Sequence, residues 1–178
     1  MFSPRITLKN GPAPGGPQLK AAIKALTSRE VLVGVPEATN RDYTGKADAK
    51  RRMVGNALIA YLMDRGSPAR GIPAREFLRP GVKDDQANTV RFMEQGARLA
   101  LNGDVTGVAK ALTAAGLSAQ KSIRRKISTG PFTPLKRSTI LARKRKHKGR
   151  KAILASDTTP LIDSGSLRQA ISFQVVDK

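Results

Sequence analysis

Alternating and β-branched apolar stretches at the two ends of the chain predict short strands. Residues 5–9 alternate polar and apolar side chains, and residues 171–176 alternate in the same way. Residues 30–35 are apolar and β-branched at successive positions, which favours a central strand. Because these segments lie near opposite ends of the sequence, we expect them to meet in one small mixed or antiparallel sheet.

Between these strands, apolar residues recur at spacings of three and four, as they do in amphipathic helices. The spacing predicts helices over 18–27, 51–65, 83–101, 105–127 and 135–146, with a short helical stretch over 167–170. The segment 51–65 is apolar nearly all the way round, so we expect it to be buried on most sides, in the core or at a subunit interface. The fold class that follows is α+β, a small sheet packed by long helices.

Glycine, proline and polar residues divide the chain into an arm and one domain. We interpret residues 1–17 as a strand followed by a Gly/Pro-rich arm, and residues 18–178 as a single α+β domain. Within that domain we expect an inserted polar loop at 36–50 and an extended basic tract at 143–151.

A proline-bounded connector at 71–82 follows the apolar helix. Its two prolines fix φ and remove backbone donors, so we expect the connector to lie outside helices and central strands. Between the prolines, the apolar Phe77 and Leu78 are flanked by the cations Arg75 and Arg79. Two interpretations are open: the connector forms a contact surface, or Phe77 and Leu78 complete the core while the arginines are solvated.

The charge of the chain narrows the choice of partners. The net charge is +20, from 33 Lys and Arg against 13 Asp and Glu, which implies a polyanion or a strongly acidic protein as partner. With 39% hydrophobic residues, 4% aromatic residues and no Trp, we expect a thin core of Ala, Leu, Ile and Val. The N-terminus lacks the apolar region of a signal peptide, and no segment has the apolar length of a membrane span, so we expect a soluble protein with no membrane contact.

Residues that could carry catalysis are sparse. Cysteine is absent and His147 is the single histidine, so thiolate and histidine metal sites lack ligands. His147 lies in a cationic tract that disfavours the proton a catalytic base accepts. Walker and dinucleotide-binding glycine motifs are also absent. Asp163 is better explained as the cap of a turn than as a catalytic acid. We therefore expect a non-enzyme without a metal or cofactor.

The basic region is the one strong electrostatic signal. No acidic residue occurs between Val105 and Ser156, where fourteen Lys and Arg side chains fall. Such a density favours phosphate backbones without sequence readout, or an acidic protein surface, and the charge alone does not choose between them. The candidate contacts are Lys121, Arg124, Arg125, Arg143, Lys144, Arg145, Lys146, Lys148, Arg150 and Lys151.

Three blocks of the sequence resemble the tail-completion and head-to-tail joining proteins of tailed bacteriophages, which are neck or minor tail proteins. The first block is Leu-Ile-Ala-Tyr-Leu-Met-Asp-Arg-Gly at 58–66, followed by Ile-Pro-Ala-Arg-Glu-Phe-Leu-Arg-Pro at 72–80. The second comprises Ile-Ser-Thr-Gly-Pro-Phe-Thr-Pro-Leu at 127–135 and Thr-Ile-Leu-Ala-Arg-Lys at 139–144. The third is Pro-Leu-Ile-Asp-Ser-Gly-Ser-Leu-Arg-Gln-Ala-Ile-Ser-Phe at 160–173.

The resemblance implies a virion structural protein in the neck or tail, present in the host cytoplasm before assembly. It would form a homo-oligomeric ring, six-fold, around the DNA channel at the head-proximal end of the tail. Its partners would be head-side connector or adaptor proteins and tail tube or terminator proteins. We expect ring contacts from the apolar helix and the connector, through Leu58, Tyr61, Leu62, Arg75, Phe77, Leu78 and Arg79. The competing hypothesis is a free nonspecific DNA-binding or packaging-associated protein.

Overall fold

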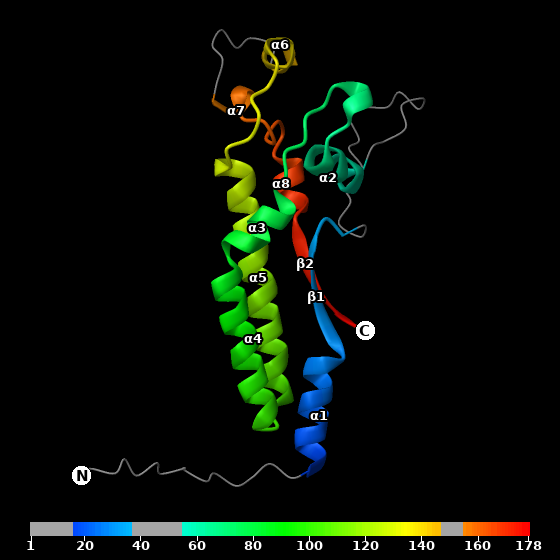
Figure 1. The fold of residues 1–178 in the computed structure, drawn as a ribbon, viewed down its shortest axis with the longest axis vertical. Coiled ribbons are helices and arrows are strands. Elements are labelled where there is room, and N and C mark those ends of the chain that lie inside the picture. The colour runs from blue at the N-terminus through cyan, green and yellow to red at the C-terminus, as the bar shows by residue number, and fades with distance from the viewer. Residues whose placement is uncertain (1–15, 37–54, 147–154) are drawn as a thin grey trace, which may run out of the picture.

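The protein is an elongated α+β molecule built around a long helical hairpin (Figure 1). The computed structural model describes residues 16–36, 55–146 and 155–178. The order of elements is α1 (Gly16–Thr27), β1 (Arg29–Gly34), α2 (Asn56–Arg65), the 3₁₀ turn η2 (Pro68–Arg70), α3 (Leu78–Asp84), α4 (Gln86–Leu101), α5 (Val105–Thr129), α6 (Arg137–Lys146), α7 (Ala155–Thr158), α8 (Ser166–Ala170) and β2 (Ser172–Asp177).

β1, which follows the first described helix, pairs with the C-terminal β2, as the sequence predicts. Among the described residues β2 is its single strand partner, so β1 is not the central strand expected at 30–35. β1 and β2 are antiparallel, and the register runs from Arg29 opposite Asp177 to Gly34 opposite Ser172. At one end of the two-stranded sheet, Arg29 and Asp177 form an ion pair in which Nε and Oδ1 lie 3.2 Å apart. The strand predicted at 5–9 and most of the loop predicted at 36–50 lie outside the described residues.

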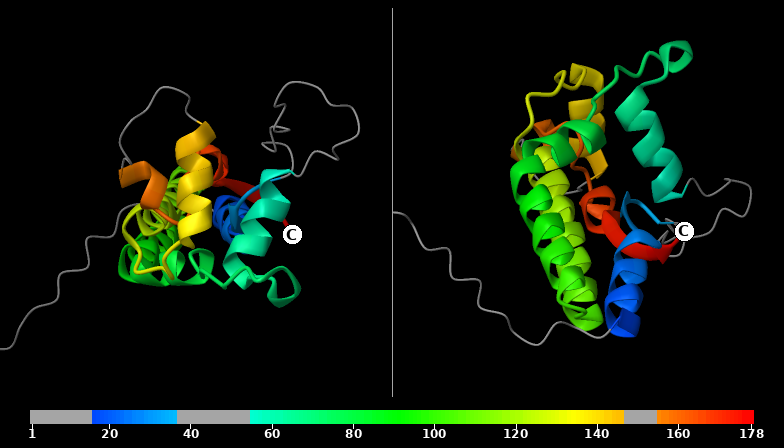
Figure 2. Two further views of the ribbon diagram at one scale, coloured as in Figure 1. Left: turned by 90° about the horizontal axis from the view of Figure 1, so that it is seen from above. Right: turned by 60° about the horizontal axis from the view of Figure 1, so that its bottom comes forward.

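The helix α5 is the central element of the fold, because it contacts the partner helix α4, the helix α3 and both strands. It starts where Asp104 caps it, since the Asp104 carboxylate accepts a hydrogen bond from the Gly107 N–H at 2.8 Å. The lower core contains Ala22, Ala100, Val108 and Leu112, and the upper core contains Ala60, Phe77, Ile123, Ile127, Leu161, Leu167 and Ile171. Because α5 supplies residues to both cores, it joins the two ends of the molecule (Figure 2).

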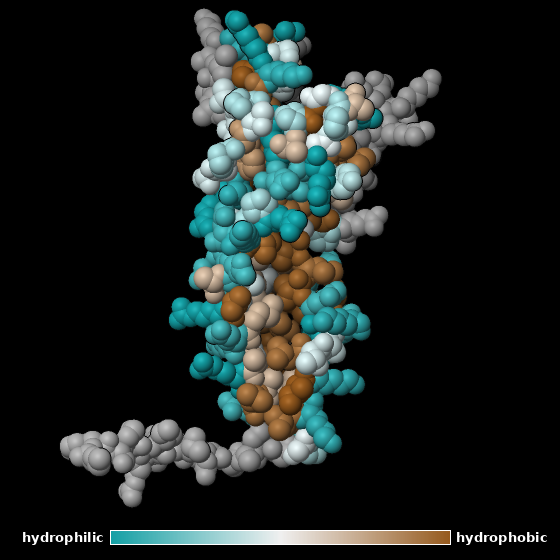
Figure 3. Space-filling model, viewed as in Figure 1, coloured by the Kyte–Doolittle hydropathy of each residue, from teal (hydrophilic) through white to brown (hydrophobic). Residues whose placement is uncertain are grey.

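Small residues let the elements approach closely. A Cβ on Gly116 of α5 would overlap the ring of Phe173 on β2, and a Cβ on Gly81 of α3 would lie 2.8 Å from the Cα of Ile123. These glycines let the backbone of one element pack directly against a large side chain or the backbone of its neighbour. In Figure 3, apolar residues form a strip along the seam between the α4–α5 hairpin and the side that carries α1 and the strands.

The connector at 71–82 differs from its prediction, because its second half is helical. α3 begins at Leu78 and includes Pro80 as its third residue. A proline in the first turn of a helix costs no hydrogen bond, since the N–H groups there have no intrahelical partner. The helix predicted at 83–101 is correspondingly split, because Asp85 leaves helical geometry between α3 and α4.

We predict that Gly81→Ala destabilises the protein by about 1–2 kcal/mol, because overpacking against the backbone of Ile123 outweighs the gain in helix propensity. Gly16→Ala is the matched control, because no heavy atom lies within 4 Å of a Cβ added there. Urea unfolding followed by circular dichroism measures both. A Gly81→Ala protein at least as stable as the control would show that α3 is free to move away from α5.

Candidate assembly surface

The connector is fixed to α2 by a buried carboxylate. Asp64, which is 6% exposed, accepts hydrogen bonds from the N–H groups of Phe77 at 2.9 Å and Leu78 at 3.0 Å, at the start of α3. The chain between them turns back on itself, since Ser67 and Ile72 exchange backbone hydrogen bonds of 2.8 and 3.0 Å. The first block of the sequence is thereby a single folded unit of α2, turn and α3 (Figure 1).

A buried arginine joins this unit to the second block. Arg75 is 6% exposed, and its guanidinium donates hydrogen bonds to the carbonyl oxygens of Thr133 at 2.9 Å and Pro134 at 3.4 Å. Burial, and to a smaller extent the positive charge of Arg143, lower the pKa of the Arg75 guanidinium. Arg75 thus holds the extended segment between α5 and α6 against the connector.

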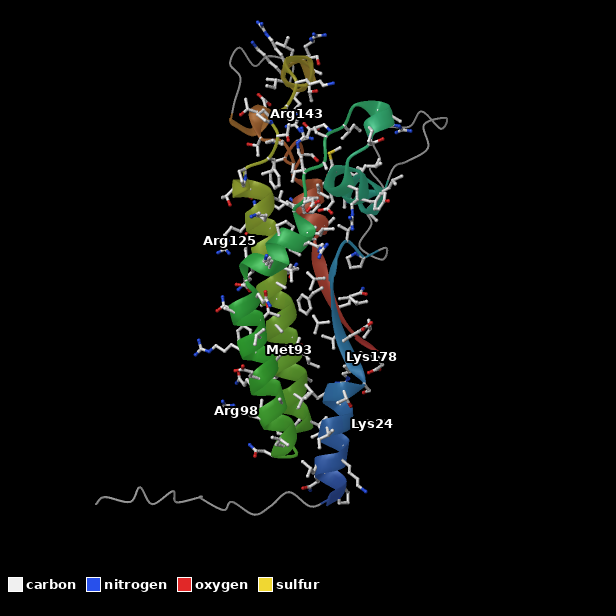
Figure 4. The ribbon with its side chains drawn as sticks, viewed as in Figure 1. Lys24, Met93, Arg98, Arg125, Arg143 and Lys178 are labelled. Atoms are coloured by element: carbon white, nitrogen blue, oxygen red, sulfur yellow. The ribbon has the colours of Figure 1, made fainter. Side chains whose placement is uncertain are left out.

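A second arginine joins the second block to the third. Arg143, on α6, donates from Nη1 to the carbonyl oxygens of Thr159 at 2.8 Å and Ile162 at 2.7 Å, and from Nη2 to that of Pro160 at 3.1 Å. Its Nε lies 3.8 Å from Oδ1 of Asp163. In Figure 4, Arg143 lies at the upper end of the molecule, near α6 and the segment between α7 and α8.

The end of α5 completes the arrangement. Gln120 Nε2 and Arg124 Nη2 each donate to the carbonyl oxygen of Ile171 at 2.8 Å, and Arg124 also reaches the carbonyl oxygen of Gln169 at 3.2 Å. These contacts place the turn between α8 and β2 on α5. The three blocks that carry the phage resemblance are therefore gathered at one end of the molecule.

The helix α2 carries three separate stripes of side chains. Asn56, Ala60 and Asp64, spaced four apart, are 4%, 3% and 6% exposed and face the interior. The exposed stripe consists of Leu58, Tyr61 and Arg65, with Leu58 51% exposed, Tyr61 63% exposed and the side chain of Arg65 62% exposed. The third stripe, Ile59 and Met63, lines a pocket.

This pocket has a volume of about 300 Å³ and lies between α2, α8 and the turn that leads into α8. Its wall is largely apolar, with Ile59 and Met63 on one side and Leu161 and Leu167 on the other. Arg143, Asp163, Ser164 and Ser166 add polar groups. Asp163 and Ser164 are exposed, so the pocket is open to solvent at that rim.

The seven residues proposed for ring contacts fall into an exposed or half-buried group and a buried group. Leu58, Tyr61 and Arg79 are exposed, and Leu62 and Leu78 are half-buried. Phe77 is 0% exposed and packs in the upper core, and Arg75 is occupied by loop carbonyls. Phe77 and Arg75 therefore hold the protomer together and are not available as surface contacts, which corrects that expectation.

The ten cations proposed for DNA or acidic-protein contact divide in a similar way. Arg124 and Arg143 are half-buried, and their guanidinium groups donate to backbone carbonyl oxygens of the same chain. Lys121, Arg125 and Arg145 are exposed and Lys144 is half-buried, and Figure 4 shows Arg125 directed away from the body of α5. The side chain of Lys146 and the residues Lys148, Arg150 and Lys151 lie outside the described part of the chain.

The structural roles of Asp64, Gln120 and Arg143 do not emerge from the sequence patterns above. A signal for Asp64 was present, because it is an acid at four-residue spacing from Ala60 on a mostly apolar helix, where a buried carboxylate must find donors. Arg143 carried no comparable signal, since it opens a run of cations.

Comparison with known protein families, with curated proteins and with solved structures gives no match. Within residues 16–36, 55–146 and 155–178, no helix is both long and apolar enough to cross a membrane. The same described residues contain no group of three His, Cys, Asp or Glu side chains placed to hold a metal ion.

We predict that Phe77→Ala lowers the free energy of unfolding by about 3–5 kcal/mol, because it removes a fully buried aromatic side chain. Tyr61→Ala, at an exposed position, should change it by no more than about 0.5 kcal/mol in the isolated protomer. Urea denaturation at a protein concentration where the chain is monomeric compares the two. Equal urea midpoints for the two variants would mean that the Phe77 side chain contributes no more to the stability of the protomer than the exposed Tyr61 side chain.

We predict that Arg143→Gln destabilises the protein by about 2–4 kcal/mol, because several loop carbonyls lose their charged donor together. Arg145→Gln removes the same charge from an exposed position two residues away and is the control. Thermal unfolding monitored by circular dichroism measures both. Equal effects of the two substitutions would mean that Arg143 acts only through its charge.

Proposed function

We propose that this chain is a non-enzymatic virion structural protein of a tailed bacteriophage, which completes the tail or joins it to the head as a six-fold ring around the DNA channel. The single observation that carries the proposal is the junction of the three sequence blocks. Asp64, Arg75 and Arg143 join segments that are far apart in the chain, and these segments are the ones that resemble the phage proteins. The similarity is thus concentrated in one folded unit.

The surface of α2 supports an oligomeric role. Leu58 and Tyr61 expose more than half of their area, on a helix whose opposite sides are buried or line the pocket. Apolar side chains gathered on one exposed stripe favour contact with another protein. In the proposed ring, that contact is between subunits.

The proposed partners above and below the ring are head-side connector or adaptor proteins and tail tube or terminator proteins. The net charge of +20 suits a position next to packaged DNA or acidic neighbours. The mature protein would reside in the neck or tail of the virion, after synthesis in the host cytoplasm.

The second candidate function is nonspecific DNA binding by the free protein. The observation that favours it is the exposed cationic side of α5, where Lys121 and Arg125 lie one helical turn apart on a helix without acidic residues. Such a surface can bind the phosphate groups of DNA without contacts to the bases, and hence without sequence specificity.

We predict that the purified protein forms ring-shaped particles of uniform subunit number and binds duplex DNA weakly at physiological salt. Negative-stain electron microscopy and native mass spectrometry measure the first property, and fluorescence anisotropy with labelled duplex DNA measures the second. Antibody labelling should place the protein at the head-proximal end of the tail in intact virions.

The alternative makes the opposite prediction. It requires a monomer whose DNA affinity falls steeply with salt, and Lys121→Gln with Arg125→Gln should reduce that salt slope by about one for each phosphate that the variant no longer neutralises. Lys20→Gln with Lys24→Gln is a control of equal charge on α1, at the far end of the molecule.

A further inference from the structure

The exposed stripe of α2 and the pocket beside α2 lie on nearly opposite sides of the same helix. At 3.6 residues per turn, the stripe of Leu58, Tyr61 and Arg65 is about 150° around the axis from the stripe of Ile59 and Met63. The first projects away from the molecule and the second faces the pocket. One copy of the chain therefore presents a protruding apolar surface and a receiving apolar pocket in different directions.

The sizes and polarities of these two surfaces match. A tyrosine buries about 150–250 Å² when it enters an apolar site, and its hydroxyl requires a polar partner there. The pocket of about 300 Å³ supplies an apolar wall from Ile59, Met63, Leu161 and Leu167 and polar groups from Ser164 and Ser166. Leu58 lies one turn from Tyr61 and would cover the edge of the same opening.

The charges also match, which matters because two copies of a chain with a net charge of +20 repel each other. Arg65 ends the protruding stripe, and its side chain is 62% exposed although its Nε lies 3.9 Å from Oδ2 of Asp64 in the same chain. The rim of the pocket carries the carboxylate of Asp163, whose side chain is 38% exposed and lies 3.8 Å from Arg143. A carboxylate has acceptor sites for more than one cation, so Asp163 can face Arg65 of a neighbour as well.

We propose that the pocket between α2 and α8 receives Leu58 and Tyr61 from a second copy of this chain, with Arg65 of one copy facing Asp163 of the next. The contact is head-to-tail, because the protruding surface and the pocket are different surfaces of each subunit. Contacts of this kind propagate from copy to copy and close into a ring when the rotation allows. This inference rests on the oligomeric role proposed above and names the surfaces that build the oligomer.

A head-to-tail contact can be distinguished from a two-fold symmetric contact by mixing two variants, each of which lacks one of the two contact surfaces. The variant Leu58→Ser/Tyr61→Ser removes the protruding surface from every copy, and Ser164→Trp fills the pocket on every copy. Each variant alone should be monomeric by native mass spectrometry. An equimolar mixture retains one intact contact, and it should form a heterodimer of one copy of each variant, without larger particles.

Leu32→Ser is the matched control, because Leu32 on β1 is 51% exposed, as is Leu58. This variant should assemble as the wild-type protein does. Thermal unfolding by circular dichroism verifies that every variant is folded. If Ser164→Trp fails to fold, the Leu58→Ser/Tyr61→Ser variant still decides the question against Leu32→Ser.

Three results would overturn the inference. Rings that persist in Leu58→Ser/Tyr61→Ser would place the subunit contact elsewhere and leave the proposed ring function intact. Folded variants that stay monomeric when mixed would exclude a contact between this stripe and this pocket. A wild-type protein that forms no oligomer would overturn both this inference and the proposed function.

Discussion

Much of this fold depends on arginine side chains that hold backbone carbonyl groups. The segments between α5 and α6 and between α7 and α8 have no strand partners, so their carbonyl oxygens need donors from elsewhere. Arg75 serves the first segment and Arg143 the second. A guanidinium has five N–H groups in a fixed planar arrangement and keeps its charge, so one side chain can satisfy several carbonyls at once.

These internal arginines change the meaning of the high positive charge. The sequence presents an uninterrupted cationic region after Val105, which favours a polyanionic partner. In the folded chain, Arg124 and Arg143 face carbonyl oxygens, and Lys126 pairs with Asp84 at 2.9 Å. The cations left at the surface, among them Lys121 and Arg125, are the ones that can meet DNA or an acidic neighbour.

The thin core limits how α2 can be stabilised. In the upper core α2 contributes Ala60, and it is fixed further by the hydrogen bonds of Asp64, while Leu58 and Tyr61 remain exposed. Met63 of α2 also packs against this core. A helix with large apolar side chains still exposed gains stability if a second protein covers them. The proposed subunit contact supplies such a cover, and it uses surface that the monomer leaves free.

The sequence by itself determined the α+β class, the pairing of terminal strands and the span of the long helix α5. The helices and strands follow from local periodicity, which burial on one face imposes wherever a helix or strand packs. The pairing follows from the need of isolated strands to share one sheet. It also identified Leu58 and Tyr61 as candidate contacts, because α2 has more apolar positions than one buried face requires.

Only the tertiary structure decided the roles of the polar residues. Asp64, Arg75 and Arg143 act on groups distant in the chain, and Arg143 has the same local pattern as the exposed Arg145. The tertiary structure likewise placed Phe77 inside the core and Tyr61 outside it, although both are aromatic residues that the sequence made candidates for ring contacts. Periodicity records which residues share a face, whereas burial and hydrogen bonding depend on what the rest of the chain brings to that face.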